Sequence, residues 1–207
     1  MNRHGRLSAA AGVLFFIGTA GAATIYNNFG PGNAYSTGAG WTVSGSTSFP
    51  GSSTAGMAFT PSGSFTLTQI DVAINLVGGT NSASLTLNSD SSGAPGAVLA
   101  TWSLSSLPAI GACCTVETVT PSGSIVLASG TQYWLVASVI ASDTWDAWML
   151  NTTGATGFKW QNGTTEADQT LGAFDVLGTP GAAVPEPSTV LLSAGGLALL
   201  WLRRLRR

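Results

Sequence analysis

Histidine and positive charge are almost absent from the middle of this chain. The single histidine is His4, and of the seven lysine and arginine residues only Lys159 lies between Thr24 and Val184. Nucleophilic catalysis of the serine–histidine or cysteine–histidine kind needs an imidazole to accept a proton. Zinc and iron sites ligated by histidine need the same side chain. Both kinds of site are therefore excluded from residues 24–183.

The shortage of basic residues leaves this stretch acidic. Residues 24–183 contain eight carboxylates and one lysine, which gives this stretch a formal charge of −7, although the whole chain carries only −2. Such a body has no basic patch for nucleic acid or anionic lipid, so we expect no nucleic-acid partner. The eight are Asp71, Asp90, Glu117, Asp143, Asp146, Glu166, Asp168 and Asp175.

Charged residues of either sign make up only 8% of the sequence, but the chain has the means to build a core. Apolar residues are 44% of it, and seven are tryptophan. A chain of 207 residues with this composition is expected to fold as one domain of ordinary size rather than to stay disordered.

The N-terminus has the order of a secretory signal peptide. Arg3 and Arg6 precede a short apolar run, and small residues follow up to Ala23. Ala20-Gly21-Ala22 fits the A-x-A pattern that precedes a cleavage site. We therefore predict that residues 1–23 are a signal peptide, with cleavage after Ala22 or Ala23.

The C-terminus joins a proline-rich motif to an apolar segment and a basic end. Residues 190–202 are predominantly apolar and are expected to form a transmembrane helix of about 20 Å, short for a hydrocarbon core of about 30 Å. Side chains at its ends can snorkel to the interface. The four terminal arginines should stay cytoplasmic and retain the chain at the membrane, which places the body on the other side. They are Arg203, Arg204, Arg206 and Arg207.

This tripartite end resembles the PEP-CTERM sorting signal of Gram-negative bacteria. The motif residues are Val184, Pro185, Glu186, Pro187, Ser188 and Thr189, and the whole signal spans residues 184–207. The resemblance implies a partner, the membrane protease-transpeptidase exosortase, which processes such chains near the Pro-Glu-Pro motif. It also implies inner-membrane anchoring before processing, followed by delivery to the cell surface or extracellular matrix.

The body, residues 24–181, has the pattern of an all-β domain. In residues 65–77, Ile70, Val72, Ile74 and Leu76 alternate with Asp71, Ala73 and Asn75, which predicts one face on a core and one toward water. Leu85 and Leu87 alternate in the same way, and residues 133–140 are apolar on both faces, as expected of a central strand. Residues 145–150 and 174–177 are further candidate strands.

Marked turns separate these runs. Residues 91–96 combine serine, glycine and proline and predict a loop. Residues 60–67 recur as residues 120–127 with six of eight positions identical, which suggests two turn-into-strand units in similar places. Many short strands with glycine- and proline-rich turns favour a β-sandwich, and more specifically a jelly-roll-like one.

The body also resembles the choice-of-anchor R domain of exported bacterial proteins, a family named for its varied anchors and not for an activity. The resemblance runs in motif order through about residues 24–180. It is carried by Asn28-Phe29-Gly30-Pro31-Gly32 with Gly40-Trp41, by Gly78-Gly79-Thr80-Asn81, by residues 89–96, by Gly130-Thr131-Gln132-Tyr133-Trp134-Leu135 and by residues 145–154.

Two groups of residues are candidates for ligand binding. Asp143 and Asp146 could be imagined as a glycosidase pair, but their spacing is no evidence of two carboxyls placed across a sugar, so solvated loop acids are the simpler interpretation. Trp145, Trp148 and Trp160 could form an exposed platform for sugars, but packing in the core or in an interface is the expected state of each, and Trp134 is expected in the core.

Metal binding has little support. Residues 88–93 look like half of a calcium loop, but Leu99 stands where the bidentate glutamate is required. We expect no cofactor and assign no metal ligand. A looser calcium site that uses Asp143, Asp146 or Asp168 stays open.

Cys113 and Cys114 are the only cysteines and are adjacent. Export permits a disulfide, so two buried thiols and a vicinal disulfide both stay open.

These features favour a non-enzymatic exported protein of the envelope or extracellular matrix. The alternatives are a carbohydrate-binding jelly-roll module for exopolysaccharide and, with less support, a glycosidase.

Overall fold

Runs of alternating apolar residues form the strands of the body. The computed structural model describes residues 21–49 and 51–181, and every regular element in that part of the chain is a β-strand. The strands are β1 (Ala23–Asn27), β2 (Tyr35–Ser44), β3 (Ala55–Phe59), β4 (Phe65–Val72), β5 (Ile74–Gly78), β6 (Ala83–Asp90), β7 (Pro95–Leu104), β8 (Glu117–Val119), β9 (Val126–Leu127), β10 (Tyr133–Val139), β11 (Trp145–Asn151), β12 (Thr156–Gln161), β13 (Thr164–Thr170) and β14 (Phe174–Pro180).

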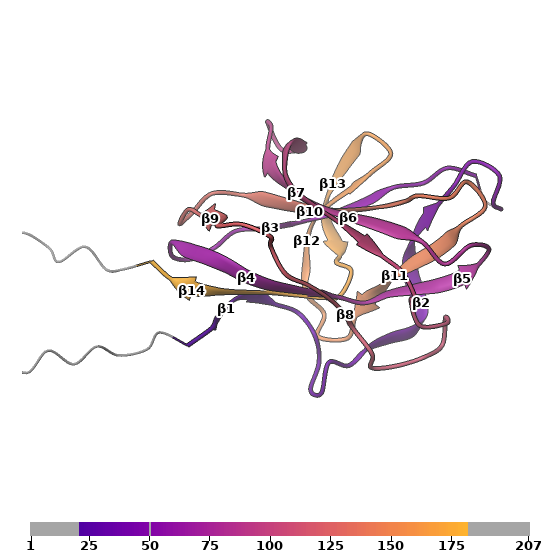
Figure 1. The fold of residues 1–207 in the computed structure, drawn as a ribbon, viewed down its shortest axis with the longest axis horizontal. Coiled ribbons are helices and arrows are strands. Elements are labelled where there is room, and N and C mark those ends of the chain that lie inside the picture. Colours follow the sequence, from indigo (N-terminus) through magenta and orange to yellow (C-terminus); the bar gives the residue numbers. More distant parts are fainter. Residues whose placement is uncertain (1–20, 50, 182–207) are drawn as a thin grey trace, which may run out of the picture.

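The strands form three sheets, and neighbouring strands are antiparallel. The five-stranded sheet has the order β1-β14-β4-β8, with β9 also paired to β4. The six-stranded sheet has the order β13-β12-β3-β10-β6-β7, and the three-stranded sheet the order β2-β11-β5. In Figure 1, β4 and β14 run below β10, β6 and β3, and β2, β5 and β11 lie at the right-hand end. The all-β prediction is confirmed, and this arrangement is consistent with a β-sandwich.

One large core is shared by all three sheets. Phe174 and Val176 reach it from the five-stranded sheet, Leu85 and Leu87 from the six-stranded sheet, and Trp148 from the three-stranded sheet. The predicted alternation of β6 is confirmed, because both leucines are fully buried. Strand β10 is central, between β3 and β6, as its apolar pattern predicted.

The predicted continuous strand over residues 65–77 divides at Ala73. Strand β4 belongs to the five-stranded sheet and β5 to the three-stranded sheet, so the chain changes sheets there. The prediction that one face meets water is wrong, because Ala73 and Asn75 are fully buried. Ala73 packs in a second, smaller cluster, and Asn75 Nδ2 donates to the carbonyls of Ala109 and Ala112. The loop that covers this face comes from a distant part of the chain.

The two repeated segments pair with each other. Strand β9 lies antiparallel to the start of β4, with Phe65 opposite Leu127 and Thr66 opposite Val126. The matching leucines of the two copies, Leu67 and Leu127, are both buried in the main core. The two copies are therefore neighbours in one sheet, but the first forms the 8-residue strand β4 and the second only the 2-residue strand β9.

Both predicted targeting segments fall mainly outside the described residues. These are residues 1–20 of the signal peptide, including Ala20, and the whole sorting signal at residues 184–207, including its predicted helix. Ala22 lies just before β1, and Ala23 is its first residue, paired with Gly178. Within residues 21–49 and 51–181 there is no helix of the length and apolarity needed to span a bilayer.

Candidate functional site

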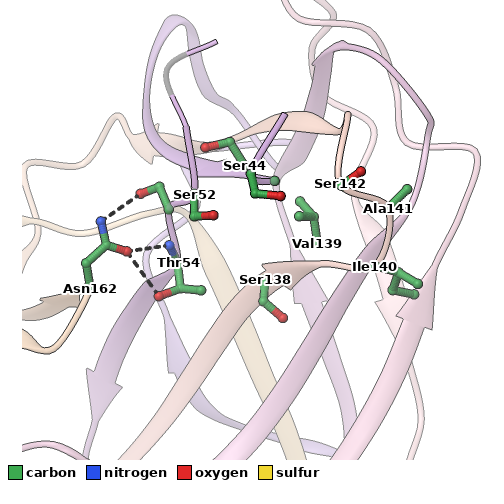
Figure 2. A pocket seen from close by; sticks show the side chains of 12 residues that line it. Ser44, Ser52, Thr54, Ser138, Val139, Ile140, Ala141, Ser142 and Asn162 are labelled. Atoms are coloured by element: carbon green, nitrogen blue, oxygen red, sulfur yellow. Dashed lines mark hydrogen bonds between the residues drawn. The ribbon is translucent and has the colours of Figure 1, made fainter. Parts of the chain in front are cut away.

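A pocket of about 320 Å³ lies where the three-stranded sheet meets the six-stranded sheet. Its walls come from the end of β2 and the loop between β2 and β3, from the end of β10 and the loop after it, and from the β12–β13 turn. Figure 2 shows the hydroxyl side chains around this hollow. The lining residues are Ser44, Gly45, Ser46, Ser52, Ser53, Thr54, Ser138, Val139, Ile140, Ala141, Ser142 and Asn162.

Backbone contacts hold the loops that form the pocket. Gly45 N donates to the Thr144 carbonyl (2.9 Å) and Thr47 N to the Ser142 carbonyl (2.9 Å). A Cβ at position 45 would collide with the Ser142 carbonyl, so only glycine allows this close approach. The loop after β2 is thereby fixed against the loop after β10.

Some polar groups of the pocket are already used within the protein. Asn162 Oδ1 accepts hydrogen bonds from Thr54 N (2.8 Å) and Thr54 Oγ1 (3.3 Å), and Ser44 Oγ donates to the Gly51 carbonyl. Three other lining serines, Ser46, Ser52 and Ser138, make no side-chain hydrogen bond within the part of the chain that the structure describes. Their hydroxyls are available to a ligand as donors or acceptors.

An aromatic pair adjoins the pocket. Trp145, the first residue of β11, lies opposite Ser44 in the strand register. Phe49 belongs to the loop after β2 and packs edge-on against Trp145, with ring centroids 6.3 Å apart. Phe49 is 83% exposed and Trp145 is half-buried. Of the three predicted platform tryptophans, Trp145 is therefore the one beside a pocket.

The other two predicted platform residues lie elsewhere. Trp148 is fully buried in the main core, and its Nε1 donates to the Ala173 carbonyl (3.0 Å), so the expected core packing is confirmed and its assignment as a possible ligand-binding residue is wrong. Trp160 is half-buried on β12, opposite Gly56 of β3, and does not join Trp145 in a common platform. Trp134 is core, as predicted, and its indole nitrogen donates to Asp90 Oδ1 (2.8 Å).

The Asp143–Asp146 pair does not form a glycosidase site. Asp143 is exposed, and its Oδ2 accepts hydrogen bonds from Thr80 N (3.2 Å) and Thr80 Oγ1 (3.0 Å). It thereby ties down a turn in which Gly79 has a φ of +80°. Asp146 is fully buried on β11, and neither carboxyl oxygen has a hydrogen-bond partner within the described residues. Because Asp146 is buried within a strand, its interpretation as a solvated loop acid and its assignment to ligand binding are both wrong, whereas Asp143 is a solvated loop acid as expected.

Burial changes the protonation of two carboxyls. It raises the pKa of Asp146 to about 7, because the charged form would lose its water without a compensating contact. Burial also raises the pKa of Asp175 to about 6, and the facing charge of Asp71 adds to this effect. Asp175 on β14 lies opposite Asp71 on β4.

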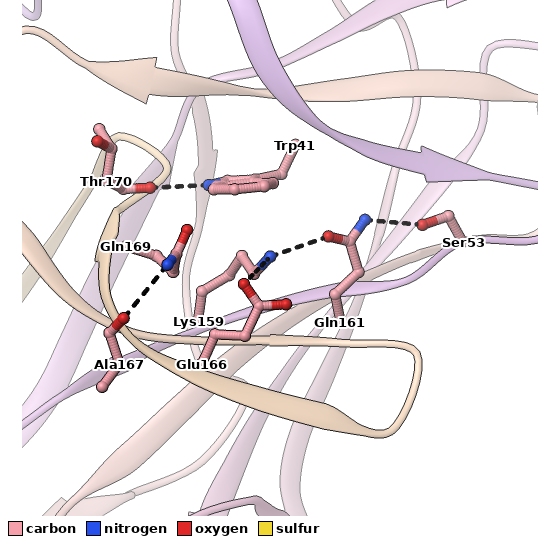
Figure 3. A network of polar contacts seen from close by, with 8 residues as sticks. All are labelled: Trp41, Ser53, Lys159, Gln161, Glu166, Ala167, Gln169 and Thr170. Carbon is pink, nitrogen blue, oxygen red and sulfur yellow. Dashed lines mark hydrogen bonds and ion pairs between the residues drawn. The ribbon is translucent and has the colours of Figure 1, made fainter.

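Lys159, the one base of the body, is in the interior. Its Nζ lies 3.2 Å from Glu166 Oε2, 3.2 Å from Gln161 Oε1 and 3.8 Å from the centroid of the Trp41 ring. Gln161 Nε2 in turn donates to Ser53 Oγ (3.1 Å), as Figure 3 shows. The buried ammonium thus holds the β12–β13 hairpin, and through Gln161 it connects to the wall of the pocket.

The described residues hold no cluster of three or more acidic, histidine or cysteine side chains suited to a metal ion. Asp143, Asp146 and Asp168 are therefore not brought together as a calcium site. Asp90, from the half-loop at residues 88–93, accepts hydrogen bonds from Trp134, Gly93 and Gln132, chiefly the first, and these lower its pKa. Its role is to support a turn and a core tryptophan.

Cys113 and Cys114 form a vicinal disulfide across a cis peptide bond. This decides between the two alternatives that the sequence left open. The pair lies in the loop before β8, where Cys114 packs on the smaller cluster and Cys113 Sγ contacts the Tyr35 carbonyl.

Sequence reasoning missed the pocket itself. Ser44, Ser138 and Asn162 stand in ordinary strand ends and loops, and only the sheet order brings them together. The one available signal was the abundance of serine around residues 44–53 together with residues 138 and 142.

Comparison with known proteins gave no matching protein-family model and no matching curated protein.

Proposed function

We propose that this chain is a non-enzymatic exported protein, sorted to the cell surface or extracellular matrix by an exosortase-type system acting on a PEP-CTERM-like signal. The observation that carries the proposal is the asymmetry of the sequence. Basic residues gather beside apolar segments at both ends, while the middle is acidic and has no histidine. In this proposal the body is a choice-of-anchor R-like domain with a jelly-roll-like sandwich.

The geometry of the body supports tethering at one end. Strands β1 and β14 are antiparallel neighbours, with Ala23 opposite Gly178. Gly181 N donates to the Ser64 carbonyl (2.9 Å), which holds the end of the described chain beside the same sheet. The body therefore receives the chain and releases it at one edge, as Figure 1 shows. A domain attached through either terminus would present the opposite end to the surroundings.

Mass spectrometry of both termini of the native protein tests this proposal. We expect a mature start at Ala23 or Thr24, and processing near residues 185–187. Glu186→Ala should abolish C-terminal processing and leave the chain in the membrane. Ala183→Ser, a substitution just outside the motif, should be processed normally. Recovery of the native chain at full length and soluble in the cytosol would refute the proposal.

A second candidate function is carbohydrate binding by the body. The uncharged, hydroxyl-lined pocket beside Trp145 favours it. A glycosidase is not favoured, because burial makes Asp146 of the Asp143–Asp146 pair inaccessible to a sugar.

A further inference from the structure

The pocket between the three-stranded and six-stranded sheets is lined by groups that suit a polyol. Ser46, Ser52 and Ser138 offer hydroxyls without partners within the described residues, and each can donate and accept. The buried hydroxyls of Ser44 and Ser53 and the exposed amide of Asn162 have hydrogen-bond partners within the protein, so the walls are held in place before any ligand arrives. A preformed pocket with a few converging polar groups is typical of a small-molecule site.

The charge around the pocket selects against acidic ligands. None of its lining residues is ionisable. The one base of the body, Lys159, is only 2% exposed and is paired with Glu166, so it offers no charge to a ligand. The formal charge of −7 over residues 24–183 repels anions. A bound molecule should therefore be neutral.

Phe49 and Trp145 supply an apolar contact beside these hydroxyls. Phe49 is almost wholly exposed, and the two rings pack at an interplanar angle of 71°. An exposed aromatic ring presents an apolar surface on which a ligand can pack. A sugar has an apolar face of C–H groups as well as a rim of hydroxyls. It therefore matches a serine-lined pocket that has an aromatic pair next to one of its lining residues, Ser44, the two rings themselves lying outside the pocket lining.

We infer that this pocket binds a short segment of a neutral polysaccharide, with sugar hydroxyls on Ser46, Ser52 and Ser138 and a ring face against Phe49 and Trp145. The volume of about 320 Å³ is at the lower end of the range of about 300–1,000 Å³ for small-molecule sites, which limits the occupant to a short segment. The inference rests on the proposed export of the chain, since the polysaccharide would be met outside the cell.

Retention of the full chain, purified in detergent, on immobilised polysaccharides tests the inference. The neutral probes are dextran, cellulose and agarose, and the acidic probe is polygalacturonate. We expect retention on at least one neutral probe and none on polygalacturonate. Phe49→Ala and Trp145→Ala should each weaken retention by about 3- to 10-fold, the contribution expected of one aromatic contact. Ser138→Phe, which fills the pocket, should abolish it.

Two matched controls separate the pocket from other surfaces. Phe158→Ala removes an aromatic side chain that is 46% exposed but does not line the pocket, and Ser103→Phe adds a ring on the exposed strand β7. Both should be retained like the wild type, and thermal unfolding checks that every variant is folded. Retention by polygalacturonate alone, or equal retention of folded Ser138→Phe, would overturn the inference.

Failure of the inference is distinct from failure of the proposed function. A chain that is processed at both termini but retained by no neutral probe would overturn the saccharide site and leave the sorting proposal intact.

Discussion

At the scale of single residues, Asp146 has the least ordinary environment. It lies on β11 opposite Val43 and Leu76, both of which belong to the main core or pack against it. Its carboxyl is therefore surrounded by apolar side chains and has no hydrogen-bond partner within the described residues. Because a charge there has neither water nor a counter-ion, the protonated form is favoured.

The protonation of Asp146 predicts a stability that falls as the pH rises. The pKa of this carboxyl is about 7 in the folded protein and near 3.8 in the unfolded chain. Between these values the folded state binds the additional proton, so the free energy of unfolding decreases from about pH 4 to about pH 7 and then levels off. The total decrease from this group is at most about 4 kcal/mol. Urea denaturation across this pH range measures it.

Substitutions separate Asp146 from Asp175, whose pKa of about 6 acts in the same direction at lower pH. In Asp146→Asn the decrease between pH 6 and 7 should disappear, while the part due to Asp175 remains. The exposed Asp143→Asn is the control and should keep the full decrease. An unchanged pH profile in Asp146→Asn would show that this carboxyl has a partner in solution.

Tryptophan substitutions distinguish core from surface. Trp148 is fully buried, and its ring lies so close to Gly172 that a Cβ there would meet Trp148 Cδ1 at 2.6 Å. Trp148→Ala should lower the free energy of unfolding by about 3–5 kcal/mol, the usual effect of removing a large core side chain. Trp145→Ala should cost about 1 kcal/mol, because Trp145 is only half-buried. Equal losses in denaturant unfolding would contradict these placements.

At the scale of elements, the β12–β13 hairpin depends on one buried charge. The Lys159 side chain is 3% exposed, whereas its partner Glu166 is 44% exposed. Strand β12 pairs with β3, so the contacts of Lys159 connect an edge hairpin to the middle of the six-stranded sheet. The two halves of this ion pair are therefore unequal, because only the carboxylate keeps access to water.

Because of this difference in exposure, we expect the free energy of unfolding to depend more on Glu166 than on Lys159. Glu166→Gln leaves an ammonium buried without its counter-ion and should lower the free energy of unfolding by about 2 kcal/mol. Lys159→Met leaves the Glu166 carboxylate, which water can still hydrate. This substitution should change the free energy of unfolding by about 1 kcal/mol or less. Asp168→Asn, the same type of change on the same hairpin, is the control and should have little effect. A larger loss in Lys159→Met than in Glu166→Gln would refute this account.

Local sequence patterns predicted where the strands lie better than they predicted what packs against each strand. The alternation of Leu85 and Leu87 identified β6, because period-two burial is a property of the strand itself. The same logic failed at Asn75, since the carbonyls of Ala109 and Ala112 that bury its amide come from a loop more than thirty residues away. Naming Trp148 as a possible platform residue failed for a similar reason, because nearby polar residues do not show which face of a strand meets the core.

At the scale of the whole molecule, the candidate pocket was beyond the reach of sequence reasoning. Ser44, Ser138 and Asn162 are brought together by pairings between distant strands, and no local pattern specifies these pairings. The acidic charge of the body, in contrast, depends on composition alone. This charge could be calculated from the sequence alone, and it disfavours an acidic ligand.

The pairing of β1 with β14 also constrains the order of folding. These strands lie about 150 residues apart, and the Tyr26 ring stacks on Phe174 with centroids 4.5 Å apart. The first strand therefore has no paired neighbour until β14, the last strand of the described residues, has been synthesised. During that interval Ile25 and Tyr26 stay uncovered, and contacts of such high sequence separation form slowly. We therefore expect a chaperone that binds the emerging N-terminal strand to assist the folding of this chain.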